Sequence, residues 1–326
     1  MMMKRIAAYI LLFLAVMACQ EKPELPQNDQ DPVLTTVRIN IEAAEEFTKA
    51  NVPLIPDVEN FIYDIWVIQF SERGVLYTGV DKFYRTNGED GARFLTLEAE
   101  VMSGKSTICL LANLNKMNTL KLGDGTYKVM EFCDVSALKA SLPDNILQFK
   151  NTLLDLGTFL HYVNTNSKPV AIPMFGYWEG SIGGGNPTLG ENNLNVTLGR
   201  MLCRVNLTIE NKSGNRLTEL KFTNASNKAY YFPQISSPEL PYDAYCTNPD
   251  ANTFVLNIAS GNAATIYFYW APNFCYGEGK ATKMTFTDEA GSTYSCYITN
   301  SSASDENCDY NMYHNCNYSI TASIGE

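Results

Sequence analysis

Two stretches of this chain alternate strictly between apolar and polar side chains, and this alternation constrains the fold more than any other feature. Between residues 36 and 43 the apolar positions are Val37, Ile39, Ile41 and Ala43. Near the end of the sequence the pattern returns, and there the apolar positions are Tyr318, Ile320, Ala322 and Ile324. Successive side chains of a β-strand point to opposite faces, so a period of two predicts half-buried strands.

Apolar and β-branched runs elsewhere predict further strands. They span residues 61–70, 93–101, 106–113, 196–209, 217–223, 253–258, 265–270, 283–287, 292–298 and 309–324. The chain is rich in tyrosine (19) and phenylalanine (16) and only 18% charged, which also favours β-structure. Helical spacing occurs in residues 136–141 and 151–163, and residues 44–60 read as a long loop. Short strands at regular intervals predict an all-β protein made of sandwiches, with a short helical insertion.

A length of 326 residues with 45% hydrophobic content is too large for one small core and predicts two domains. Residues 179–195 are rich in glycine and asparagine, and apolar alternation resumes after them. We therefore expect an N-terminal domain over residues 33–190 and a C-terminal domain over residues 191–326.

The first 18 residues have the character of an export signal. Positive charge at Lys4 and Arg5 precedes an apolar run, residues 6–16, that is too short to span a bilayer as a helix. The sequence Val-Met-Ala-Cys at 16–19 is similar to the bacterial lipobox, so Cys19 is the expected lipidation site and first residue of the mature protein. An ordinary signal peptide is the alternative. The polar, proline-bearing residues 19–32 predict a flexible tether.

Composition argues against several function classes. The net charge of -11 repels nucleic acid, whose binding proteins are basic. No CxxC pair occurs, and His161 and His314 are the two histidines of the chain, so we expect no metal and no cofactor. Both histidines lie in apolar segments and are expected to be structural, and no catalytic group is expected. Eight cysteines besides Cys19 allow disulfides or buried thiols in an exported protein.

Three tryptophans could stack on sugar rings. Trp66 and Trp270 lie in strongly apolar segments and are expected in the core, whereas Trp178, beside Tyr177 and glycines, is a candidate exposed contact.

Several segments, taken in order, resemble the fimbrillins of type V pili. These are the lipobox cysteine, DIWVIQFSERG, STICLLANLN, AIPMFG, VTLGRMLCRVNLTI, LTELKFTNASNKAYYFP, YWAPN and the terminal YHNCNYSITASI. The resemblance implies two transthyretin-like β-sandwich domains and a non-enzymatic fibre subunit of the cell surface, held in the outer membrane through the lipid on Cys19. Its implied partners are other pilus subunits and a host or bacterial surface ligand for adhesion.

The resemblance also implies assembly by strand exchange. A protease removes the first strand, and the terminal strand of the next subunit, here Tyr318, Ile320, Ala322 and Ile324, fills the groove. Stalk subunits of this kind are cut after an arginine, but residues 44–60 contain no arginine, and Lys49 is their one basic residue. The chain is therefore either cut near Lys49 or keeps its first strand as a membrane-retained anchor subunit. The terminal strand could also complete the chain's own sheet.

A function of a different class stays open at this point. β-Sandwiches with aromatic side chains also serve carbohydrate capture, so a glycan-binding surface lipoprotein is the alternative.

Overall fold

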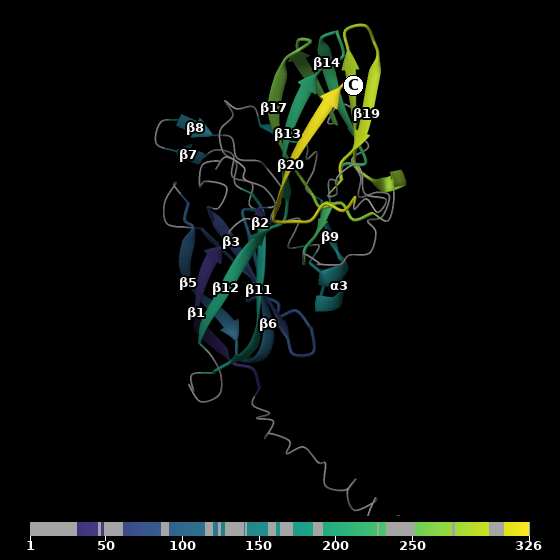
Figure 1. Cartoon of the computed structure of the whole chain (residues 1–326). Helices are drawn as coiled ribbons and strands as arrows, with labels where there is room; N and C mark the ends of the chain where they lie inside the picture. Colours follow the sequence, from purple (N-terminus) through teal and green to yellow (C-terminus); the bar gives the residue numbers. More distant parts are fainter. Residues whose placement is uncertain are drawn as a thin grey trace, which may run out of the picture. The chain divides into compact units, whose positions relative to one another are not determined.

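A computed structural model of the chain describes residues 31–44, 47–48, 61–85, 91–114, 120–122, 125–127, 140, 142–155, 161–163, 172–184, 192–226, 228–232, 252–275, 278–299 and 310–325. The chain separates into two units, Met1–Val33 and Leu34–Glu326, and all the strands below lie in the second. Within the described residues, strands dominate (Figure 1).

The first sheet has seven strands in the order β4-β3-β6-β11-β12-β1-β5. Their bounds are β1 (Leu34–Ala43), β3 (Asp64–Ser71), β4 (Lys82–Arg85), β5 (Phe94–Met102), β6 (Gly104–Ala112), β11 (Met174–Ile182) and β12 (Asn193–Arg200). β11 pairs with β6 from Met174 to Ile182, but it meets β12 at only two residue pairs. The sheet therefore bends at this junction, and its two arms enclose one apolar core between them.

Gly176 lies at the bend. A Cβ atom there would approach the carbonyl oxygen of Thr197 to 2.5 Å and the side chains of Leu198 and Val196 to 2.8 Å. The two arms can come this close only because position 176 has no side chain.

A second sandwich consists of two sheets, and most of their strands come from the second half of the chain. One has the order β10-β17-β13-β20-β2 and the other β16-β14-β18-β19. The bounds are β2 (Phe47–Thr48), β10 (His161–Val163), β13 (Cys203–Asn211), β14 (Leu217–Thr223), β16 (Thr253–Ile258), β17 (Ala263–Trp270), β18 (Lys283–Asp288), β19 (Thr293–Tyr297) and β20 (Cys316–Ile324). Side chains from both sheets share one core, in which the Phe222 and Phe268 rings meet edge-on with centroids 4.9 Å apart.

The remaining described elements are short. They are β7 (Leu120–Leu122), β8 (Gly125–Tyr127), β9 (Leu153–Asp155), β15 (Lys228–Tyr230), the helix α3 (Ile146–Asn151) and the 3-10 turn η4 (Glu278–Lys280). α3 contributes Phe149 to a third apolar cluster, which also holds Trp66 and Phe70 from β3 and Tyr231, stacked 5.0 Å from Phe149.

The prediction of an all-β sandwich fold with a short helical insertion is confirmed, but the helix lies at a different position from the one predicted. The helix spans Ile146–Asn151 rather than residues 151–163, because Asn145 caps it by accepting a hydrogen bond from the Leu147 N–H. After the helix ends, β9 pairs with β15, and β10, which contains His161, pairs with β17. Cross-strand pairing has overridden the local helical spacing.

The sheets also do not divide at residue 190. The predicted strand 196–209 is two strands, because the chain turns at Met201 and Leu202 and passes from the first sheet to the second. β12 thus lies after the predicted boundary but pairs with β1 and β11 in the first sheet.

Ile65, Val67 and Ile209, which lie in the predicted strands 61–70 and 196–209, are all buried, with exposed fractions of 0%, 1% and 0%. Replacing Ile65 or Ile209 by alanine should lower the free energy of unfolding by roughly 2–5 kcal/mol, because each change leaves a cavity, and Val67→Ala should cost less. Urea denaturation measures this. Unchanged midpoints in all three variants would contradict the assigned strands.

Candidate functional site

β1 lies in the interior of the first sheet, between two strands from distant parts of the sequence. It runs antiparallel to β5 from Leu34 to Glu42 and parallel to β12 from Arg38 to Ala43. Its inward row is buried, with exposed fractions of 0% for Val37 and Ile39, 2% for Ile41 and 1% for Ala43. β1 therefore completes two hydrogen-bond ladders and one side of the core.

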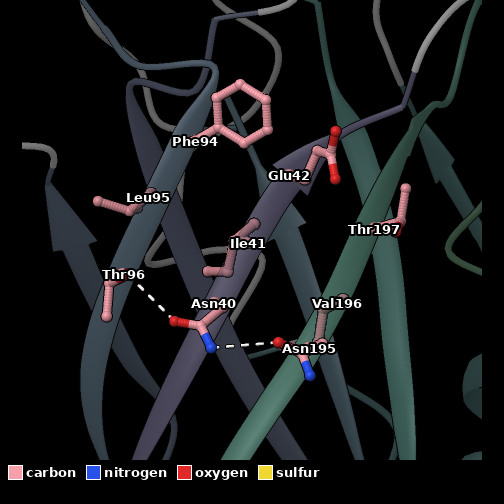
Figure 2. Close-up of a pocket in the computed structure, with 9 residues that line it drawn as sticks. All are labelled: Asn40, Ile41, Glu42, Phe94, Leu95, Thr96, Asn195, Val196 and Thr197. Carbon is pink, nitrogen blue, oxygen red and sulfur yellow. Dashed lines mark hydrogen bonds between the residues drawn. The ribbon is translucent and has the colours of Figure 1, made fainter.

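The outward face of β1 is polar and is held by side-chain hydrogen bonds across three strands. The Thr96 hydroxyl donates to Asn40 Oδ1 over 3.1 Å, and Asn40 Nδ2 donates to Asn195 Oδ1 over 3.1 Å (Figure 2). These residues line an open, shallow depression together with Ile41, Glu42, Phe94, Leu95, Val196 and Thr197. The lining residues come from β1 and from its two neighbours β5 and β12. Because β1 lies between these neighbours, the depression has this form only while β1 is in place.

The predicted terminal strand is β20, and it is shorter than expected because Asn315 adopts a positive φ of 52° before it. β20 runs parallel to β13 from Asn317 to Ile324 and places its apolar row in the second core. Tyr318 and Ala322 are 6% exposed and Ile324 is 4% exposed, whereas Ile320 is half-buried.

The main chain of β20 shows which edge is used. The Lys212 N–H donates to the Ile324 carbonyl, so the even-numbered residues of β20 direct their backbone groups toward β13. Ser319, Thr321 and Ser323 consequently direct theirs toward the opposite edge, and their side chains are exposed. Among the described strands, the neighbour on that edge is β2, which pairs only with Cys316 and Asn317.

β2 lies within the segment that the sequence predicted as a loop, and it connects the two candidate strands. The chain leaves β1 at Ala43 and pairs with the start of β20 at Phe47. No periodicity signals so short a strand, and its pairing depends on the distant residue Cys316. Sequence reasoning had no signal for it.

Cys19 and Lys49 lie outside the described residues. Trp66 is buried, as expected, and the Trp178 ring is half-buried against the first core and approaches the position of a Cβ on Gly180 to 2.5 Å. The exposed aromatic side chain at that point is instead Tyr177, 47% exposed and 4.7 Å from the Phe232 ring. The described residues contain no cluster of potential metal ligands.

His314 is half-buried just before β20. Burial lowers its pKa, and a hydrogen bond with the Arg200 backbone only partly opposes this effect. Asn315, the next residue, donates its N–H to the Leu202 carbonyl, which ties this turn to the start of β13.

The lowered pKa of His314 predicts a loss of stability in acid. The unfolded-state pKa is about 6.5, so below that pH the unfolded chain binds the proton that the folded chain resists. The free energy of unfolding is therefore unaffected by His314 above pH 6.5 and decreases as the pH falls below this value. The thermal midpoint should therefore fall more between pH 7.5 and 5.5 in the wild type than in His314→Gln. Parallel pH profiles would contradict this.

No helix in the described part of the chain is long and apolar enough to cross a membrane. No protein-family model and no curated protein sequence matches the chain.

Solved structures do match. The tip fimbrial protein Mfa3 from Porphyromonas gingivalis, with a C-terminal truncation, has a TM-score of 0.54 and 15% identity over 89% of this chain and 94% of that one. A candidate cell adhesion protein from Parabacteroides distasonis has a TM-score of 0.58 and 15% identity over 89% and 88%. A second from the same organism has a TM-score of 0.52 and 13% identity over 90% and 93%. At these identities the comparisons show the fold: the chain folds as these fimbrial and adhesion proteins do.

Proposed function

We propose that this chain is a structural subunit of a cell-surface fimbrium, exported as a lipoprotein through Cys19 and joined to other subunits by strand exchange. The observation that carries the proposal is the position of β1. It is a complete strand in the interior of a sheet, and it connects to the rest of the fold through the segment that contains Lys49.

Loss of β1 would open a slot of defined chemistry. The facing edges of β5 and β12 would each expose unpaired N–H and C=O groups, and the core would lose the row from Val37 to Ala43. Unpaired backbone groups and exposed apolar surface are both costly. A period-two strand from another subunit would satisfy both, since its main chain would pair with the two edges while alternate side chains fill the core.

β20 has the properties that such a donor needs. It has nine residues against ten in β1, and each strand carries a row of four apolar side chains. Its release would expose Tyr318, Ala322 and Ile324, so exchange requires that the slot of the neighbour compensate for the loss of those contacts.

A cut at Lys49 would act on both strands at once. β1 and β2 both precede Lys49, so one cleavage would release the occupant of the slot and also the strand that pairs with the start of β20. A subunit that is not cut would keep its slot filled, as an anchor does. The fimbrial and adhesion proteins that share the fold support the fimbrial assignment.

Deletion of the gene tests the proposal at the level of the cell. Electron microscopy should show fibres that are lost or shortened in the deletion strain and restored by complementation. Mass spectrometry of the mature N-terminus separates the roles, because a start near residue 50 indicates a cleaved stalk subunit and a start at Cys19 indicates a retained one. Unaltered fibres would contradict the proposal.

Lipidation of Cys19 has its own test. Cys19→Ser should move the protein from the detergent phase to the aqueous phase, or leave the signal uncleaved, because each buried CH₂ of the acyl chains contributes ~0.8 kcal/mol to membrane binding. Triton X-114 partitioning measures this, and Cys109→Ser, at a buried core thiol, serves as the control. Detergent-phase partitioning equal to that of the wild type in a Cys19→Ser protein whose signal has been removed would refute lipidation.

A further inference from the structure

Two cysteines lie side by side where the terminal strand begins. Cys203 is the first residue of β13 and Cys316 is the first residue of β20. The strands are parallel neighbours, and their pairing starts at Arg204 and Asn317, so the two cysteines are one step before a matched pair. Cys203 belongs to the second core with 1% exposure, and the half-buried Cys316 packs against the same core. Their side chains therefore face the same side of the sheet.

This placement meets the main geometric condition for a disulfide. Neighbouring strands lie about 4.7–4.9 Å apart, within the range of Cα separations, about 4.4–6.8 Å, that disulfides span. The Cβ atoms must approach somewhat more closely than in an undistorted sheet. That adjustment is accessible because both cysteines begin their strands and the turn at Asn315 directly precedes one of them.

The other described cysteines are not arranged in this way. Cys109 pairs across strands with Ile68 and Tyr177, and Cys296 pairs with Met284. Cys275 lies after β17, with its sulfur 3.5 Å from the Tyr310 carbonyl. Within the described residues, Cys203 and Cys316 are the cysteines that share adjacent strands and one face.

We propose that Cys203 and Cys316 form a disulfide bond after export, which fixes the root of the terminal strand to β13. Each thiol loses one proton and together the two sulfurs lose two electrons, which reduce the disulfide of an envelope oxidant or of oxidised glutathione to two thiols. The proposal rests on export to an oxidising compartment, which is part of the proposed function.

The position of the bond determines what it can do. It joins the base of β20 and leaves Tyr318–Ile324 held only by non-covalent contacts. The strand can therefore leave its sheet while its root stays covalently attached to the second sandwich. A pulling force on a donated strand would then be transmitted through the disulfide to β13. Without the bond, the same force could detach residue 316 and the preceding turn from the second sandwich.

Peptide mapping tests the bond directly. Protein is isolated from the cell envelope in iodoacetamide, denatured without reductant, and digested with trypsin and Asp-N. Tryptic cleavage gives Met201–Arg204 and Asp-N cleavage gives Asp309–Glu326, each with a single cysteine. We expect these two peptides as one cross-linked species that disappears with dithiothreitol. Recovery of both peptides as carbamidomethyl forms, or linkage of Cys203 to another cysteine, would overturn the proposal.

A stability measurement gives an independent readout. Dithiothreitol should lower the thermal midpoint of the wild type by roughly 5–15 °C, because the bond closes a loop of more than a hundred residues. The midpoint of Cys316→Ala should not respond, whereas that of Cys296→Ala, the matched control on β19, should respond as in the wild type. An equal response in Cys316→Ala would contradict the bond. If Cys316→Ala does not fold, the map of the wild type still decides. Unaltered fibres in the deletion strain, with the cross-linked peptides present in the wild type, would instead count against the proposed function alone.

Discussion

Replacing Ile39 by aspartate is expected to lower the free energy of unfolding by about 5 kcal/mol or more in the chain that retains β1. Ile39 is fully buried and lies between Leu97 of β5 and Leu194 of β12. A carboxyl group at this position has no hydrogen-bond partner in an apolar core, and the contacts of the isoleucine are lost as well. Guanidinium denaturation of the purified full-length chain measures the change.

Asn40→Asp is the matched control for this variant, because the next side chain on the same strand faces solvent. It keeps an acceptor for the Thr96 hydroxyl, so its effect should stay below about 1 kcal/mol. Equal stabilities of the two variants would mean that β1 does not fill the first core.

Replacing Ile320 by aspartate is expected to remove the chain from fibres while leaving a folded monomer. Ile320 is only half-buried in its own sheet, so the charge can reach water there at a cost of about 1–3 kcal/mol. In the slot of a neighbour, the same side chain would face a closed apolar core and find no partner. The measurement is immunoblotting of sheared fibres beside a protease-protection assay of the envelope protein.

Thr321→Asp serves as the control, since Thr321 is exposed on β20 and should allow incorporation into fibres. Normal incorporation of Ile320→Asp would contradict strand donation. Deleting residues 317–326 would be a less specific test than Ile320→Asp, because it also removes Tyr318, Ala322 and Ile324 from the chain's own second core.

The alternation in the sequence was enough to predict β1 and β20, because each strand has one face on a core and one toward solvent. Burial follows the predicted pattern residue by residue from Val37 to Ala43, and at Tyr318, Ala322 and Ile324 in β20. The burial of Ile65 and Ile209 also agrees with the predicted strands, because Ile65 lies in the apolar run of β3 and Ile209 continues the alternating apolar row of β13.

Long-range pairing could not be predicted in the same way. Nothing in residues 193–200 indicates that β12 pairs with β1, about 150 residues earlier, and the turn at Met201 and Leu202 lies inside the segment 196–209 that the sequence predicted as one strand. Leu153 and Leu154 belong to the segment 151–163, whose apolar residues have helical spacing, but strand pairing with β15 determines their conformation. These outcomes depend on contacts between distant segments, to which a local pattern is blind.

Photocrosslinking from Thr321 in assembled fibres can show directly whether β20 acts between subunits. A benzophenone side chain at this exposed position should react with whichever strand borders the outer face of β20. We expect cross-linked oligomers in which peptides from β20 of one subunit are joined to the neighbour's strands that occupy the positions of β5 or β12. Cross-links confined to a single chain, to β13 and its surroundings, would contradict it.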